Sequence, residues 1–117
     1  MNRLLIMLTL LTIINVYPSQ QRVSISRGFF TGKEYFEMSD GEKRAYVTGA
    51  INGMLVSPLF GAPEDRVTWL KTCTVKLSDV ETSAILSKYI SSDPNQMTLS
   101  LNVVTYNALK DACDRMK

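Results

Sequence analysis

The chain has 117 residues, of which 13 are basic, 11 are acidic and none is histidine, so its formal net charge is +2. The basic and acidic residues are interspersed and form no basic run or stripe, which argues against nucleic acid and acidic membrane surfaces as partners. Two cysteines without any histidine also argue against a zinc site, and the chain lacks the commonest general base.

The first 19 residues have the composition of a secretory signal peptide. One positive charge, Arg3, precedes an apolar run over residues 4–16 that is shorter than the about 20 residues needed to span a bilayer. Ser19 is the best small residue for cleavage. We therefore predict a signal peptide over residues 1–19, export to the periplasm, and no membrane attachment after cleavage.

The mature chain is expected to be a short arm followed by one compact domain. Residues 20–28 are polar and lack a clear pairing partner, so we predict a mobile arm there. Residues 29–117 are enough for one hydrophobic core and not for two.

Two helices are predicted at the start of this domain. Thr31 is a preferred N-cap residue, and a short helix over residues 33–38 follows it. Ser39 and Glu42 then form the Ser-x-x-Glu capping box of a longer helix over residues 40–57, which Pro58 ends.

Small residues recur every four positions along the longer helix, at Ala45, Gly49 and Gly53. This spacing places them on one helix face as a ridge with almost no side chain. Each glycine inside a helix costs roughly 1 kcal/mol relative to alanine. We therefore expect another backbone to pack closely against this ridge.

A loop is predicted after Pro58, because two prolines, a glycine and three successive charges follow one another there. Phe60 lies within it, flanked by Glu64, Asp65 and Arg66. An aromatic residue beside charges has the composition of a protein-interface anchor with a polar rim. The alternative is that Phe60 packs into the core and that the charges keep the loop hydrated.

The second half of the domain is also predicted to be helical. A short helix or a single turn is expected over residues 67–72. A second capping box, Ser78 with Glu81, opens a helix that ends near Ser91. The side chains of this helix expected inside the domain are Val80, Ala84, Ile85, Tyr89 and Ile90.

The last helix is predicted to start at Asp93, with Pro94 at its first helical position. One apolar stripe of this helix consists of Met97, Leu101, Val104, Ala108 and Ala112. No segment alternates between apolar and polar residues with hairpin signals at its ends. The predicted fold class is therefore all-α, a single compact domain of four to five helices.

Cys73 and Cys113 are the two cysteines of the chain. In an exported protein such a pair indicates one disulfide bond. Two free thiols would require that the chain is not exported.

No arrangement of side chains in the sequence indicates an enzyme. Glu34 and Glu37 share a helix face and could form a carboxylate pair, but we expect both to be solvated. Ser39 could act as a nucleophile paired with Lys43, but its position is better explained as an N-cap. We expect no catalytic residue, no cofactor and no metal.

Three patches of the sequence resemble the Rap/Tai immunity proteins, which are exported, all-helical proteins that protect bacteria from cell-wall amidase effectors of type VI secretion. The patch over residues 46–53 is similar to the Tyr-Val-x-Gly segment in the long helix of that family. The second patch is Cys73 followed by Leu77-Ser78-Asp79-Val80, which leads into a helix that ends with Lys88-Tyr89-Ile90 before Asp93-Pro94. The third patch is Ala108-Leu109 with Cys113.

The resemblance implies a periplasmic immunity protein that performs no catalysis. Such a protein binds its cognate peptidoglycan amidase effector and occludes the active site of that enzyme. Similar proteins act as homodimers, for which the small-residue ridge is one candidate surface. The family match does not identify the contact residues. Composition alone selects Phe60, Glu64, Asp65 and Arg66.

A different class of function is a periplasmic stress or chaperone-like protein, because small disulfide-bonded helical domains also occur there. Such a protein would bind many unfolded clients rather than one partner. The two classes are distinguished by the number of proteins that bind tightly.

Overall fold

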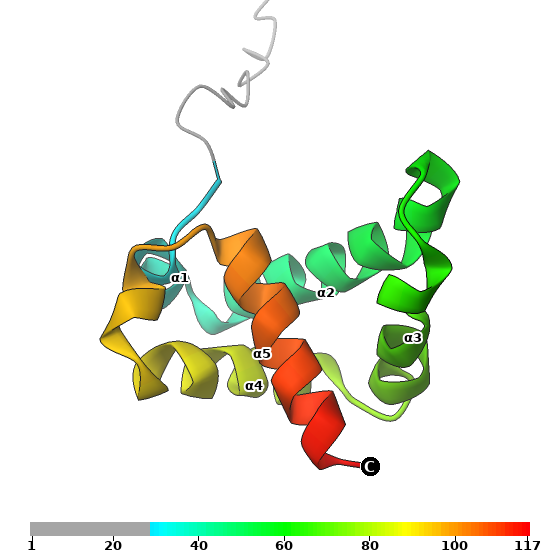
Figure 1. The fold of residues 1–117 in the computed structure, drawn as a ribbon. Coiled ribbons are helices and arrows are strands. Elements are labelled where there is room, and N and C mark those ends of the chain that lie inside the picture. The colour runs from blue at the N-terminus through cyan, green and yellow to red at the C-terminus, as the bar shows by residue number, and fades with distance from the viewer. Residues whose placement is uncertain (1–28) are drawn as a thin grey trace, which may run out of the picture.

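Figure 1 shows the fold in a computed structural model, which describes residues 29–117. The predictions of a signal peptide over residues 1–19 and a mobile arm over residues 20–28 lie outside the described residues. The described part contains five α-helices and three 3₁₀ turns: α1 Gly32–Glu37, α2 Asp40–Val56, η2 Ser57–Phe60, η3 Glu64–Arg66, α3 Thr68–Thr74, α4 Asp79–Ser92, η4 Pro94–Met97 and α5 Leu101–Arg115.

The all-α prediction is confirmed for this part of the chain, which forms one compact domain with a Cys73–Cys113 disulfide. Residues 29–117 form no β-strand and contain one isolated bridge, between Thr31 and Ser100. Within the same range, no helix has the length and apolarity that a membrane crossing requires.

Capping boxes start three of the helices. In α2 and α4 they are the predicted pairs, Ser39 with Glu42 and Ser78 with Glu81. Thr31 caps α1 as predicted, and Glu34 completes a third box there. In all three, the glutamate accepts a 2.7 Å hydrogen bond from the backbone N–H of the capping residue. These short-range interactions explain why the starts of these helices could be predicted from sequence.

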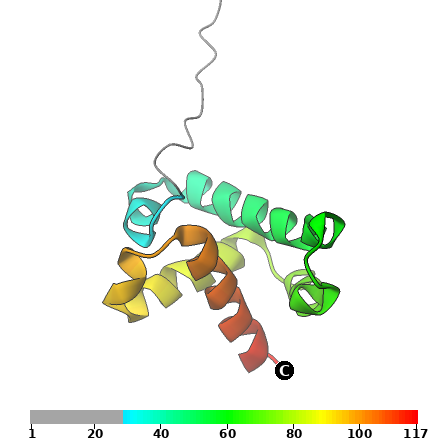
Figure 2. The ribbon, with the colours of Figure 1, turned by 45° about the horizontal axis from the view of Figure 1, so that its top comes forward.

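Helices α2 and α4 pack against each other, and α5 crosses them (Figures 1 and 2). Helix α3 lies at the far end of α2 and packs against α5. The largest fully buried side chains come from α1 through α5 and form one core: Tyr35, Val47, Leu70, Leu86, Ile90, Leu101, Val104 and Leu109. The buried Tyr35 hydroxyl donates to the carbonyl of Ser83 at 2.9 Å, which joins α1 to α4.

The prediction that the last helix starts at Asp93 is wrong, because α5 begins at Leu101. Asp93 instead caps the short η4, where its carboxylate accepts from the N–H of Asn95 at 3.0 Å. The N–H of Leu101 donates to the carbonyl of Phe30 at 2.6 Å. The start of α5 is therefore set by Phe30, a residue that is distant in sequence but adjacent in space.

The predicted interior face of α4 is partly wrong. Val80 and Ala84 are exposed, and the fully buried positions are Thr82, Leu86 and Ile90. Thr82 can be buried because its hydroxyl donates to a carbonyl of its own helix at 3.1 Å. The helix is consequently rotated relative to the face that apolar residues alone predict. Two of the predicted side chains, Ile85 and Tyr89, are half-buried against the core.

The ridge on α2 is exposed, so the expectation that a backbone packs closely against it is wrong within residues 29–117. Ala45, Gly49 and Gly53 all face solvent, and a Cβ added to either glycine would meet no atom within 4 Å. Helix α2 buries a different face, through Val47 and Ile51. The homodimer implied by the resemblance stays a prediction, with this open ridge as its candidate surface.

The close backbone approach in this domain occurs at Gly32. A Cβ at this position would overlap the carbonyl oxygen of Gln96 and lie 3.0 Å from the Cα of Met97. Gly32 is buried where α1 meets η4. Position 32 therefore requires glycine, because any larger residue would prevent α1 and η4 from packing this closely.

Candidate functional site

The predicted partner-binding residues all lie on one segment, Ser57–Arg66, which we call the projecting segment. It continues from the end of α2 and extends beyond α3 (Figure 1). Gly61 turns the chain after η2 with a φ of 97°, a left-handed conformation that favours glycine. The N–H groups of Gly61 and Ala62 donate to the carbonyls of Pro58 and Ser57 at 3.1 and 3.2 Å. The turn is thus closed by its own backbone.

The tip of the projecting segment carries two large apolar side chains in solvent. Phe60 is 86% exposed and Leu59 is 82% exposed. The alternative in which Phe60 packs into the core is therefore wrong. Val56, at the end of α2, is also exposed and precedes them. Adjacent exposed apolar side chains of this size are typical of interaction surfaces.

The base of the projecting segment is held at the carbonyl oxygen of Arg66. It accepts a hydrogen bond from Trp69 Nε1 at 2.7 Å and another from the Tyr106 hydroxyl at 3.4 Å. The two rings meet edge to face with centroids 5.6 Å apart. The Lys110 ammonium lies 5.2 Å from the centroid of the indole. One carbonyl therefore connects the projecting segment to both α3 and α5.

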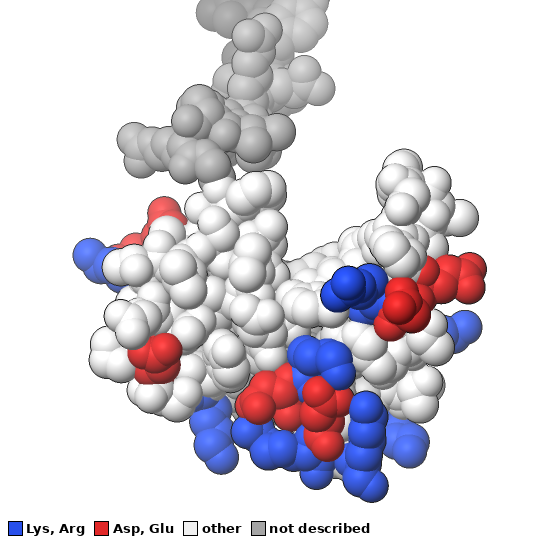
Figure 3. Space-filling view, viewed as in Figure 1, with Lys and Arg blue, Asp and Glu red and all other residues white. Residues whose placement is uncertain are grey.

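The charged residues lie at the foot of the projecting segment and not at its tip. Glu64, Asp65 and Arg66 are exposed, and no ion pair involves them in the described part of the chain. Figure 3 shows acidic and basic groups side by side below an uncharged tip. The candidates predicted from sequence thus form an apolar tip above a charged rim.

A groove of about 570 Å³ lies at the foot of the same segment. Gly53 contributes to it, so part of the small-residue ridge opens a surface hollow. Residues of α5, far away in sequence, form its opposite side, and sequence reasoning missed them. The glycine was the available signal, but it was assigned to close packing. The lining residues are Ala50, Gly53, Met54, Ser57, Arg66, Val67, Asn102 and Tyr106.

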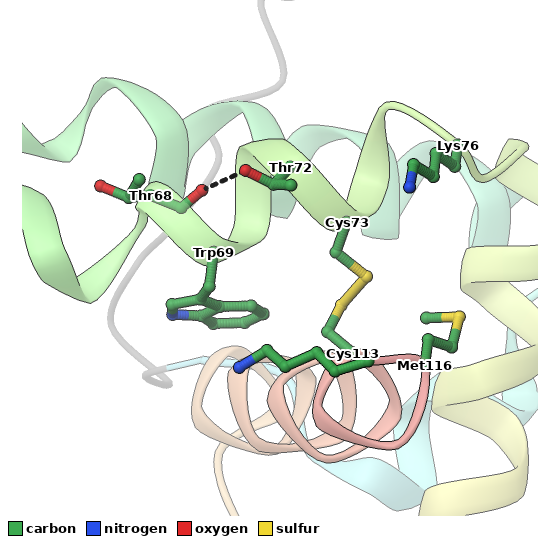
Figure 4. A pocket seen from close by; sticks show the side chains of 8 residues that line it. Thr68, Trp69, Thr72, Cys73, Lys76, Cys113 and Met116 are labelled. Carbon is green, nitrogen blue, oxygen red and sulfur yellow. Dashed lines mark hydrogen bonds between the residues drawn. A yellow bond between two sulfur atoms is a disulfide. The ribbon is translucent and has the colours of Figure 1, made fainter.

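A second hollow, which we call the disulfide cavity, lies between α3 and α5 and has a volume of about 660 Å³ (Figure 4). The Cys73–Cys113 disulfide, predicted from the cysteine count, lies in its wall, with a Cα–Cα distance of 5.8 Å. The sequence did not predict the cavity, because its walls come from two helices whose packing is a tertiary property. Its lining residues are Thr68, Trp69, Thr72, Cys73, Lys76, Cys113, Met116 and Lys117.

The side chains considered for catalysis have structural roles. Glu34 and Ser39 are members of capping boxes, and Lys43 lies 5.6 Å from the ring centroids of both Tyr35 and Phe36. Burial raises the pKa of the Tyr35 hydroxyl, so it stays protonated as a donor to α4. No group of three or more potential metal ligands occurs among residues 29–117.

Comparison of the chain with protein-family models, with curated proteins and with solved structures found no match. The resemblance to the Rap/Tai family therefore stays a prediction.

Proposed function

We propose that this protein is a periplasmic immunity protein that binds a cell-wall amidase effector of type VI secretion and occludes its active site. The observation that supports this proposal best is the exposed Leu59–Phe60 pair on a turn whose base is held by Trp69 and Tyr106. The family resemblance supplies the class of partner, and the structure supplies the candidate contact surface.

The apolar tip can provide much of the binding free energy. Burying one exposed leucine or phenylalanine side chain is worth about 1.5–3 kcal/mol. The closed turn and the shared acceptor at Arg66 order the segment before binding, so less conformational entropy is lost on association. The charged rim of Glu64, Asp65 and Arg66 then sets the orientation and the partner specificity.

In this mechanism the protein performs no chemical step. The projecting segment enters the substrate cleft of the amidase and prevents peptidoglycan from reaching the catalytic residues of that enzyme. Inhibition then requires only that the segment occupies the cleft, so affinity and inhibition should change together among variants.

The direct test measures the rate at which a purified cysteine-histidine amidase encoded next to this chain hydrolyses peptidoglycan, with increasing amounts of this protein. We expect stoichiometric inhibition by the wild type. Replacing Phe60 with Ala and Glu64, Asp65 and Arg66 with Ser should weaken inhibition by about 30-fold or more, since interface anchors contribute about 2 kcal/mol or more.

The matched control is Phe29→Ala, because Phe29 is another exposed aromatic residue, 65% exposed, outside the projecting segment. It should inhibit like the wild type. Circular dichroism should show the same helix content for all three proteins. Equal inhibition by the wild type and the four-residue variant would refute the assignment of the segment. A wild type that binds no such amidase would refute the proposed function itself.

A chaperone-like role is the second candidate, and a separate observation favours it. Phe29, Phe30, Leu99 and Val103 are all exposed, so the apolar surface is not limited to the projecting segment. Apolar surface at more than one place is suited to clients of many sequences. Recovery of many unfolded proteins with similar affinities would support this role, whereas one tight partner would support immunity.

A further inference from the structure

The disulfide cavity has the size and the walls of a small-molecule site. Its volume of about 660 Å³ is within the about 300–1,000 Å³ typical of ligand pockets. Figure 4 shows the Trp69 indole on one side of the disulfide and Met116 on the other. The cavity contains no residue of the projecting segment, although Trp69 in its wall also supports that segment. An inference about the cavity therefore does not depend on the proposed function.

The walls of the cavity favour an aromatic ring. An indole, a disulfide and a thioether are polarizable groups that contact aromatic rings favourably through edge-to-face and sulfur–aromatic arrangements. The hydroxyls of Thr68 and Thr72 donate to carbonyls of Glu64 and Thr68, at 2.8 and 3.2 Å. Because these donors already have acceptors, the cavity offers few polar groups to a ligand apart from its lysines.

The charges around the cavity favour an anion. Lys76 lines it, and its side chain makes no ion pair within residues 29–117. Figure 4 shows the Lys76 side chain extending toward the disulfide. Lys117, also in the lining, shares the carboxylate of Asp114 with Lys110, at 2.9 and 2.7 Å. Two ammonium groups thus share one carboxylate, and a third, on Lys76, is free to bind a ligand.

From this combination we propose that the disulfide cavity binds a small aromatic carboxylate. The ring lies between Trp69 and Met116, against the disulfide, and the carboxylate binds the Lys76 ammonium.

The proposal is tested by titrating the intact protein with 3-phenylpropionate, using 3-phenylpropanol as the uncharged analogue. Trp69 is the only tryptophan of the chain, so its fluorescence and its indole N–H resonance report on one residue in the wall of this cavity. We expect saturable changes with a dissociation constant on the order of 1 mM for the acid, as befits about ten non-hydrogen atoms, and binding about fivefold weaker or more for the alcohol.

Lys76→Gln should weaken binding of the acid by about fivefold and leave binding of the alcohol unchanged, as expected for the loss of one exposed charge contact. Lys71→Gln is the matched control, because Lys71 is an exposed lysine of α3 that does not line the cavity. It should bind the acid like the wild type. No saturable signal from Trp69, or equal loss of affinity in both lysine variants, would overturn the proposal.

Discussion

Trp69 and Tyr106 donate hydrogen bonds to the same backbone oxygen, that of Arg66, while their rings meet edge to face at 5.6 Å. Trp69 belongs to α3 and Tyr106 to α5, so a single acceptor joins two helices to the foot of the projecting segment. The segment carries its exposed apolar tip on this support. The two donors can be removed separately by single substitutions.

Tyr106→Phe removes one donor and retains the ring. We expect it to lower the free energy of unfolding by about 0.5–1.5 kcal/mol, the net value of one hydrogen bond. Trp69→Phe should cost more, because it also removes buried ring area. Urea unfolding of both single variants and the double variant gives their coupling energy. Strictly additive losses would contradict a shared support at Arg66.

Gly32→Ala and Gly49→Ala should have opposite effects on stability. At Gly32 the new methyl group would overlap the Gln96 carbonyl, so we expect a loss of about 1–3 kcal/mol. At Gly49 it would meet nothing within 4 Å, so we expect a gain of about 0.5–1 kcal/mol from improved helix propensity. Thermal unfolding at low protein concentration measures both. A destabilised Gly49→Ala monomer would show that this ridge does pack against another backbone.

Replacing Cys73 and Cys113 together with serine should destabilise the domain. The cysteines are 40 residues apart, and closing a loop of that length is worth about 4 kcal/mol in the chain-entropy model. We expect urea to unfold the double variant at a lower concentration than the oxidised wild type. The reduced wild type should match the variant. A loss below about 1 kcal/mol would show that packing alone holds α3 in place.

The free energy of unfolding should fall as the pH drops below about 4.5, the ordinary pKa of glutamate. Backbone hydrogen bonds from Ser39 and Ser78 lower the pKa of Glu42 and Glu81 in the folded state. The unfolded chain therefore binds these protons more readily than the folded chain. The stability from the two carboxylates is present above the unfolded pKa and is lost as the pH falls through the lower, folded value.

The Glu42→Gln/Glu81→Gln variant tests this assignment, because glutamine can keep the capping geometry without titrating. Its stability should change less between pH 6 and pH 3 than that of the wild type, measured by urea unfolding at each pH. Glu37→Gln replaces a carboxylate that caps no helix and serves as the control. Equal pH dependence of the capping variant and the wild type would contradict the assignment.

The parts of the fold that the sequence predicted depend on short-range chemistry. Each capping box joins two residues within one helical turn, Ser39 with Glu42 in α2 and Ser78 with Glu81 in α4. The boxes can therefore be recognised without knowledge of the fold. The start of α5 could not be predicted in this way. The Leu101 N–H finds its acceptor on Phe30, and the local Asp93-Pro94 signal opens only the short η4.

The candidate surface also combines residues that lie close in sequence with residues that do not. Composition selected Phe60 and the three charges that follow, and these lie together on the projecting segment. The groove below the segment depends on Tyr106 of α5, and the disulfide cavity depends on how α3 packs against α5. Such surfaces are formed by tertiary packing. No local pattern reveals them.

The pairing of Phe30 with Leu101 fixes where the chain enters the domain. This entry lies beside α1, and the projecting segment lies at the other end of α2 (Figure 2). The 17 residues of α2 span about 25 Å. A linker attached upstream of Phe29 therefore leaves the tip accessible on a sensor surface. A linker after Met116 would instead begin at the rim of the disulfide cavity. The choice of attachment point thus decides which of the two surfaces a binding assay can examine.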